Sequence, residues 1–125
     1  SPRFTCVLDG IGVRDNETGL VWEKQSSASI FNWEQAFARC QNGSIAGRQG
    51  WRLPRLDELQ SLYLSVSDPD PFLGSMGNAH WSSTPSMISA GFAWLYYPET
   101  GTTSVSGTTA TINVICVRGP GGGRQ

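Results

Sequence analysis

The sequence predicts one α+β domain built from two short helices, several short strands and long loops. Apolar residues recur at helical spacing in two stretches, residues 33–40 and residues 56–63. Segments rich in β-forming residues, bounded by turn signals, fill the two ends of the chain. Glycine, serine and threonine are abundant and Lys24 is the only lysine, which suits a loop-rich surface domain better than a cytosolic enzyme. A chain of 125 residues is large enough to bury one core.

Three short strands are expected before the first helix, because β-forming residues alternate there with turn signals. A polar loop at residues 25–30 separates these strands from the helix. In order, the expected segments are a strand at residues 4–8, a turn at 9–10, a strand at 12–14, a turn at 15–19 and a strand at 20–23.

The first helix has a recognisable beginning and end. Asn32 is a good N-cap, and Gln35 three residues later completes a box-like start. Asn42-Gly43 is a typical helix end. The apolar stripe between these ends consists of Trp33, Ala36, Phe37 and Cys40.

The most specific stretch of the chain is residues 50–62, which predicts the second helix. Pro54 fixes its own φ and lacks an N–H, so it is expected to start the helix. Asp57 and Glu58 then lie in the first turn, where the helix dipole favours negative charge. The apolar stripe consists of Leu56, Leu59, Leu62 and Tyr63.

The rest of the chain is first a loop and then β-rich. Residues 65–78 contain two Asp-Pro pairs and little periodicity, so they are expected to form a long loop, of a length that is usually functional or mobile. The domain is expected to span residues 1–119, followed by a flexible glycine-rich tail at residues 120–125. Strands are expected at residues 80–83, 92–97, 102–106 and 112–118.

The net charge of −1 hides an uneven layout. Residues 39–55 contain four arginines and no acid, whereas residues 56–117 contain five acids and no lysine or arginine. Such a layout could bind an anionic polysaccharide through Arg39, Arg48 and Arg55, or let copies attract one another head to tail. The alternative is that some arginines are internal ties, for which Arg52 is the best candidate. No apolar run reaches the roughly 18 residues of a membrane span, and a nucleic-acid partner is not expected.

The three cysteines fit no metal motif, and His80 is the only histidine. Asp68 and Asp70 could offer oxygen ligands, but such a pair is more often part of a solvated loop. In an oxidising compartment we expect one disulfide and one leftover cysteine. A bond between Cys40 and Cys116 would close a loop of about 76 residues and stabilise the fold by about 4 kcal/mol. Cys6 would then be either a small buried residue or available to a partner chain.

Several further residues are candidates for binding or modification. Trp94 and Tyr96 could stack on sugar rings, although such aromatics more often belong to the core. Asn16 and Asn42 each begin a glycosylation sequon. His80 lacks a nucleophile or carboxylate at a telling spacing, so we expect no catalytic residue, no metal and no cofactor.

Short motifs follow one another along the chain at residues 15–22, 33–36, Cys40, 51–54, 58–59, 81–84 and 116–119. Their order resembles the domain family named after the C-terminal domain of a Legionella collagen-like adhesin. The resemblance covers most of the chain and implies a C-type lectin-like fold, in which two helices pack on a twisted antiparallel sheet. It also implies a disulfide between Cys40 and Cys116. Arg55 departs from the Ser or Thr cap that is usual in the family, and the calcium-dependent sugar motifs of true C-type lectins are absent.

Two functions are expected from these observations. The first is a non-enzymatic extracellular adhesion module that recognises anionic or other glycans on a surface. The second is a subunit of a surface filament or homo-oligomer, assembled head to tail through the N-terminal strand with Phe4 and Cys6 at the contact. Both place the protein outside the cell or on its surface.

Overall fold

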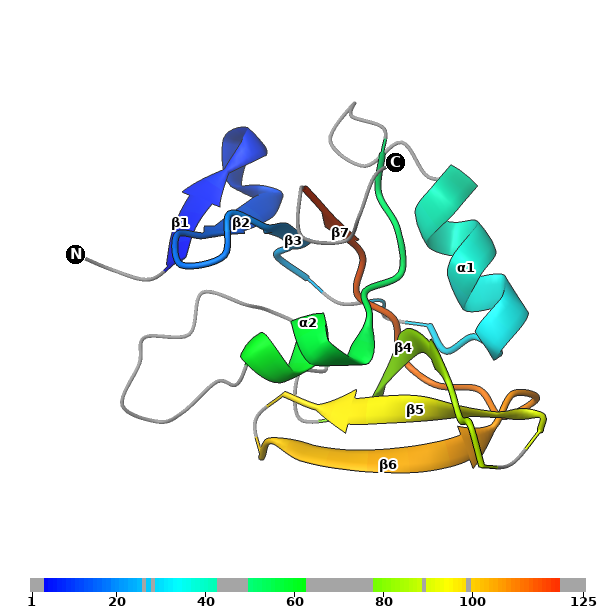
Figure 1. Cartoon of the computed structure of the whole chain (residues 1–125). Coiled ribbons are helices and arrows are strands. Elements are labelled where there is room, and N and C mark those ends of the chain that lie inside the picture. Colours follow the sequence, from blue (N-terminus) through cyan, green and yellow to red (C-terminus); the bar gives the residue numbers. More distant parts are fainter. Residues whose placement is uncertain are drawn as a thin grey trace.

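The structure is a computed structural model that contains two helices and two antiparallel sheets (Figure 1). It describes residues 4–25, 27, 29–42, 50–62, 78–88, 90–98 and 100–119. The predicted loop at residues 65–78 lies almost wholly outside the described residues, as do the predicted tail and Arg48. In the described part, no helix has the length and apolar character needed to cross a membrane.

The first sheet collects the three N-terminal strands and the end of the chain in the order β1-β2-β3-β7, all antiparallel. A single 3-10 turn (η1, Leu8–Gly10) joins β1 to β2, and Gly10 takes a left-handed φ of 85° there, as the predicted hairpin turn requires. The strands are β1 (Phe4–Val7), β2 (Gly12–Asp15), β3 (Val21–Glu23) and β7 (Val117–Arg118).

The second sheet is a three-stranded antiparallel meander in the order β4-β5-β6. β5 and β6 pair residue for residue over their whole length, whereas the β4–β5 register shifts between Trp81 and Pro85. The strands are β4 (His80–Pro85), β5 (Phe92–Tyr97) and β6 (Thr102–Gly107).

The prediction of a single sheet is therefore wrong, and the final strand is shorter than expected. Residues 112–116 do not join a ladder because their backbone groups bond to several different segments, including Phe31 and Ser27 before α1 and Glu23 of β3. Ser27 donates its N–H to the Val114 carbonyl at 2.8 Å, and its hydroxyl accepts the Val114 N–H at 2.9 Å. The same segment connects the two sheets, since Trp81 donates its N–H to the Asn113 carbonyl at 3.1 Å.

The first helix, α1 (Trp33–Asn42), confirms the sequence prediction. The Asn32 Oδ1 accepts the Gln35 N–H at 2.8 Å, and the Gln35 Oε1 accepts the Asn32 N–H at 3.0 Å, which completes the predicted capping box. Ala36 and Cys40 are fully buried, so the apolar stripe faces the core.

The second helix, α2 (Leu56–Ser61), begins two residues later than predicted, so Pro54 precedes the helix. Two acceptors replace the missing Ser or Thr cap. The Glu58 carboxylate accepts the Arg55 N–H at 2.9 Å, and the Thr84 hydroxyl of β4 accepts the Leu56 N–H at 3.0 Å. A residue from another element thus caps α2 where Arg55 cannot, because a guanidinium has no acceptor.

The core has two clusters, one on each side of residues 113–117. The first lies between the N-terminal sheet and α2, and the second lies between α1 and the second sheet. The first contains Val13, Leu20, Trp22, Leu59, Leu62, Tyr96, Ile115 and Val117. The second contains Ala36, Cys40, Trp51, Leu53, Trp81, Ala93, Leu95, Val114 and Cys116.

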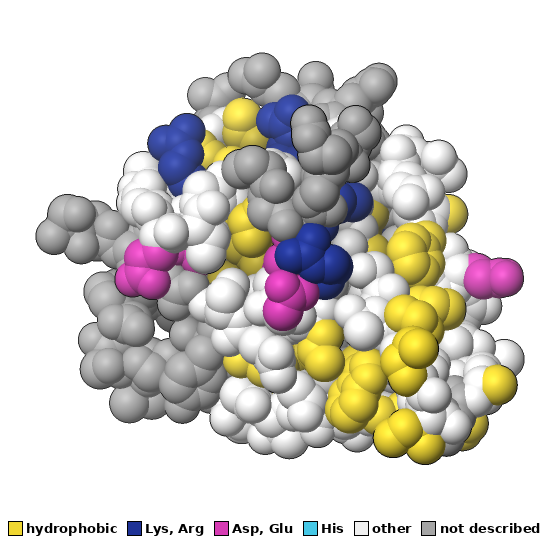
Figure 2. Space-filling model, in the orientation of Figure 1, with side chains coloured by type: hydrophobic (Ala, Val, Ile, Leu, Met, Phe, Trp, Pro, Cys, Tyr) yellow, Lys and Arg dark blue, Asp and Glu magenta, His cyan; other side chains and the backbone are white. Residues whose placement is uncertain are grey.

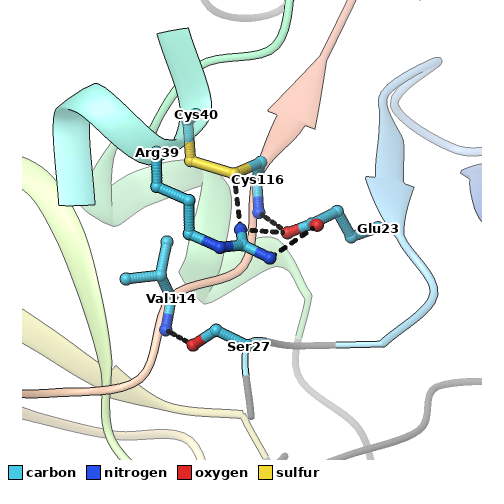
Figure 3. Close-up of a disulfide and its surroundings, with 6 residues drawn as sticks. All are labelled: Glu23, Ser27, Arg39, Cys40, Val114 and Cys116. Atoms are coloured by element: carbon cyan, nitrogen blue, oxygen red, sulfur yellow. Dashed lines mark hydrogen bonds and ion pairs between the residues drawn. A yellow bond between two sulfur atoms is a disulfide. The ribbon is translucent and has the colours of Figure 1, made fainter. Parts of the chain in front are cut away.

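A disulfide between Cys40 and Cys116 confirms the predicted pairing and ties α1 to the C-terminal segment (Figure 3). Beside it, the Arg39 guanidinium forms two hydrogen bonds with the Glu23 carboxylate, at 2.9 and 3.0 Å. The same carboxylate accepts the Cys116 N–H at 2.7 Å. These three connections join α1, β3 and the last segment, and we call this region the clamp.

A second buried ion pair lies at the start of α2. Arg52 donates two hydrogen bonds to Glu58, both at 2.8 Å, which confirms Arg52 as an internal tie. The Glu58 side chain is only 4% exposed. Burial alone would raise the pKa of Glu58, but the Arg52 guanidinium and the Arg55 N–H hold that pKa below its ordinary value.

Candidate functional site

An open groove lies between the N-terminal turns of α1, the β4–β5 connection and the turn that follows β6. Its volume is about 540 Å³, which is within the range of small-molecule sites. The lining consists of Asn32, Trp33, Glu34, Phe37, Pro85, Ser86, Ala90, Gly91, Phe92, Thr108 and Thr109.

Backbone hydrogen bonds fix the three walls of the groove to one another. Trp33 donates its N–H to the Thr108 carbonyl at 3.1 Å, and Thr108 donates its own to the Gly91 carbonyl at 2.9 Å. Ser86 donates to the Phe92 carbonyl at 2.9 Å and closes the β4–β5 connection. Segments distant in sequence are thereby held together, so the groove is preformed.

Aromatic side chains give the groove its apolar surface. Trp33 and Phe37 meet edge to face with ring centroids 5.1 Å apart, and the Trp33 Nε1 donates to the Ser82 carbonyl at 2.8 Å, which fixes that ring. Phe92 is 42% exposed, and Met87 and Ile88 in the β4–β5 connection are each 91% exposed. Figure 2 shows hydrophobic side chains gathered on the side of the molecule where Figure 1 places α1 and the β4–β5 connection.

The rest of the lining is polar and nearly uncharged. Ser86, Thr108 and Thr109 contribute hydroxyl groups, and Asn32 contributes an amide. Among the described residues that line the groove, Glu34 is the only one with an ionisable side chain, and it is exposed. The groove therefore offers aromatic faces and hydrogen-bonding groups, with one negative charge at its rim.

The described arginines that were predicted to form a basic patch pair with acidic side chains and do not line the groove. Arg39 pairs with Glu23 in the clamp, and its side chain is only 26% exposed. Arg55 pairs through its Nε with Asp57 at 3.0 Å. This hydrogen bond raises the pKa of Arg55 and lowers the pKa of Asp57. Arg48 lies outside the described residues. Each arginine described in residues 39–55 thus has an acidic partner, Glu23 for Arg39, Glu58 for Arg52 and Asp57 for Arg55.

The two aromatic candidates on β5 have different environments. Tyr96 is 1% exposed, it belongs to the first core cluster, and its hydroxyl donates to the Gln60 carbonyl at 3.4 Å. The prediction that Tyr96 stacks on a sugar is therefore wrong, because α2 and the core cover its ring. Trp94 is half-buried and does not line the groove, and its binding role stays a prediction.

The remaining candidates lie on the first sheet and at the end of α1. Cys6 is exposed and free, so the expectation of one leftover cysteine is confirmed and its alternative as a buried residue is wrong. Phe4 packs partly against the first core cluster. Asn16 is exposed and donates to the Thr5 hydroxyl at 2.8 Å, and Asn42 is exposed at the end of α1. Assembly through β1 and glycosylation at either asparagine stay predictions.

His80 is a core residue in this fold. It is fully buried at the junction of the two sheets, and its ring contacts the Asn78 carbonyl through Nδ1 at 2.8 Å. Burial lowers the pKa of His80 to about 4, so the ring is neutral at physiological pH. Among the described residues, no group of three or more His, Cys, Asp and Glu side chains could hold a metal ion.

The groove was not anticipated from the sequence. Trp33 and Phe37 fit a helical core stripe, and Phe92 fits the start of a strand. No local signal connects these residues with Thr108, since only tertiary hydrogen bonds bring their segments together. A weak signal existed in Met87 and Ile88, which are apolar residues between turn-forming ones.

Comparisons with known proteins agree with this architecture. No curated protein matches the sequence significantly. A chain in the solved complex of a mutant von Willebrand factor A1 domain with botrocetin is similar over 94% of this chain and 97% of that chain. The identity is 11% and the TM-score is 0.53, so the likeness concerns the fold alone. The family model of the Lcl C-terminal domain matches residues 12–118, and the chain therefore belongs to the Lcl C-terminal domain family.

Proposed function

We propose that this domain is a non-enzymatic adhesion module with a C-type lectin-like fold, and that it binds an uncharged glycan in the groove beside α1. The observation that carries the proposal is the pairing of exposed aromatic rings with hydroxyl and amide groups in one preformed groove. Membership of an adhesin domain family supports the general role.

The chemistry of the groove suits a sugar. A pyranose ring presents C–H groups that pack on aromatic faces and hydroxyl groups that exchange hydrogen bonds with polar side chains. Phe92 and Trp33 can supply the first kind of contact, and Thr108 and Thr109 the second. Because the walls are already bonded to one another, little conformational entropy is lost on binding.

The distribution of charge favours an uncharged glycan over an anionic one. Arg39 and Arg55 each have an acidic partner, so an anionic sugar would have to compete with Glu23 or Asp57. Glu34, at the rim of the groove, would repel a sulfate or carboxylate. This refines the broader expectation of anionic or other glycans.

A binding role is favoured over turnover by the scarcity of reactive groups. Glycoside hydrolysis ordinarily uses two carboxylates on opposite sides of the bond that is cleaved. The described part of the lining offers Glu34 alone, and the buried, neutral His80 does not line the groove. An extracellular or surface location agrees with the buried disulfide, since such bonds persist in oxidising compartments.

Binding is tested by titrating the isotope-labelled full chain with neutral oligosaccharides and, separately, with heparin fragments, and following amide chemical shifts. We expect neutral sugars to shift the amides of Gly91, Phe92 and Thr108. Phe92→Ala should weaken this binding by about tenfold, the value of one lost aromatic contact. Ile11→Ala removes an apolar side chain of similar exposure (47%) from the turn that precedes β2 and should have no effect.

Two outcomes would contradict the proposal. One is that neutral sugars of several classes leave the groove amides unshifted. The other is that heparin binds more strongly and loses its affinity on Arg55→Ala while Phe92→Ala has no effect, which would restore the arginine patch as the site.

A structural subunit of a surface filament is the second candidate, and the exposed thiol of Cys6 on edge strand β1 favours it. Head-to-tail contacts through β1 would produce open filaments or closed rings, depending on the rotation between copies. Native material that shows only monomers by electron microscopy would remove this candidate.

A further inference from the structure

We propose that the outer edge of β6 pairs with β6 of a second copy of this chain, so that two three-stranded sheets join into one across a two-fold axis. This inference concerns a different surface from the groove and goes beyond the proposed glycan binding. It rests on the state of the sheet edges, on the composition of β6, and on the apolar side chains next to it.

The other long edge of the second sheet is already occupied. On β4, Ser83 donates its N–H to the Pro54 carbonyl at 2.7 Å, and Trp81 donates to the Asn113 carbonyl at 3.1 Å. The short strand β7 at the end of the first sheet is covered in the same way, since Arg52 and Val117 exchange two backbone hydrogen bonds of 2.8 and 3.0 Å. In both places, a connecting segment satisfies the edge.

The outer edge of β6 is different. Among the residues that the structure describes, Thr103 to Ser106 have no backbone hydrogen bond outside the β5–β6 ladder. Alternate residues of an edge strand turn their N–H and C=O groups away from the neighbouring strand. In Figure 1, β6 forms the lower border of the molecule, and no coloured element lies beyond it.

β6 also lacks the features that usually protect an edge strand. Natural edges carry lysine, proline or a bulge, or are very short. β6 has six residues, pairs with β5 without interruption, and reads Thr-Thr-Ser-Val-Ser-Gly, with no charge and no proline. The strand is therefore a long, regular edge that can accept another strand.

The composition of β6 favours a second copy as the occupant. Antiparallel pairing about a two-fold axis places each residue of the strand opposite a residue of the same strand, and any charge would meet a like charge near the axis. Because β6 is uncharged, that repulsion is absent. Threonine and valine are also favourable in cross-strand pairs.

Apolar side chains beside the edge add to the surface that such pairing would bury. Val105 is 37% exposed and lies directly across from the half-buried Trp94, so both lie on one face of the sheet. Neither residue lines the groove. Two copies would bring these side chains together along the axis.

The test uses the full chain with Cys6→Ser, which removes disulfide-linked dimers, in sedimentation equilibrium from about 1 μM to about 1 mM, a range that covers weak dimers. We expect reversible dimers. Val105→Lys should raise the dissociation constant by about tenfold or more through like-charge repulsion. Thr5→Lys places the same charge on the exposed part of edge strand β1 and should leave the constant unchanged.

A charge exchange makes the test specific for β6. Val105→Glu alone should also dissociate the dimer, whereas an equimolar mixture of the Val105→Lys and Val105→Glu proteins should restore it. Three results would overturn the proposal: a chain that stays monomeric over the whole range, dimers that withstand Val105→Lys, or dimers that are lost on Thr5→Lys instead. Failure of the mixture to dimerise would equally exclude a contact between β6 and its copy.

Discussion

The clamp and the groove use the two ends of one helix in opposite ways. At its C-terminal end, α1 contributes Arg39 and Cys40 to a buried region where a charge pair and a disulfide are shielded from water. At its N-terminal end, α1 contributes Trp33 and Phe37 to a surface that stays open. The buried end holds polar groups that are paired, and the open end holds apolar groups that are only partly covered.

This inversion has a physical reason. A buried charge is tolerated only when partners replace its hydration, and Glu23 has three such hydrogen bonds, from Arg39 and from the Cys116 N–H. A half-exposed aromatic ring buries only part of its apolar surface on folding, so a ligand can bury the rest. The clamp should therefore determine stability, and the groove should determine binding.

The disulfide gives the largest expected difference between the two regions. The double variant Cys40→Ala with Cys116→Ala should lower the free energy of unfolding by about 4 kcal/mol, because a closed loop of 76 residues is released in the unfolded chain. Phe92→Ala in the groove should lower it by less than about 0.5 kcal/mol, as for an exposed residue. Urea unfolding of both proteins measures the difference, and equal losses would refute the division of roles.

Two glutamates provide a matched pair for the next comparison. Glu58→Gln leaves the Arg52 guanidinium buried without its counter-charge, so we expect a loss of about 3 kcal/mol in the free energy of unfolding. Glu34→Gln makes the same chemical change at the exposed rim of the groove and should be neutral within about 0.5 kcal/mol. Urea unfolding of both variants measures the two losses in the free energy of unfolding. A loss from Glu34→Gln as large as that from Glu58→Gln would contradict the expected difference between the two regions.

The sequence predicted those parts of the fold whose causes are local. The capping box of Asn32 and Gln35 depends on residues three apart, and the two helical stripes depend on spacing within one element. Arg52 as an internal tie followed from its apolar neighbours Trp51 and Leu53. The pairing of Cys40 with Cys116 was implied by family resemblance, and each partner lies in the segment that the resemblance indicated.

The features that the sequence did not predict depend on contacts between distant segments. Thr84 caps α2 from 28 residues away, and Ser27 holds residues 113–114 out of the sheet from more than 85 residues away. Neither hydroxyl differs locally from its many Ser and Thr neighbours. The groove is hidden for the same reason, because an aromatic residue half-exposed at a wall has the same local pattern as one buried in a core.

His80 gives the smallest of the three effects and tests the junction between the two sheets. Burial holds its pKa at about 4, below the ordinary 6.5, so the folded state favours the neutral ring. The unfolded chain therefore binds a proton at a higher pH than the folded chain. Stability is complete above about pH 6.5 and falls as the pH approaches 4, by about 2 kcal/mol between pH 7.5 and pH 5.

That pH range separates the effect of His80 from the effects of the two carboxylates of α2 that pair with arginines. The pKa values of Asp57 and Glu58 are lowered, so their contributions to stability are lost only below their ordinary values of 3.8 and 4.5. Urea unfolding at several pH values should show the decline above pH 5 in the native sequence and not in His80→Gln, whatever the absolute stability of that variant. An unchanged pH dependence in His80→Gln would mean that another group carries the effect. The fall in stability between pH 7.5 and pH 5 would then come from protonation of a group other than the buried imidazole of His80.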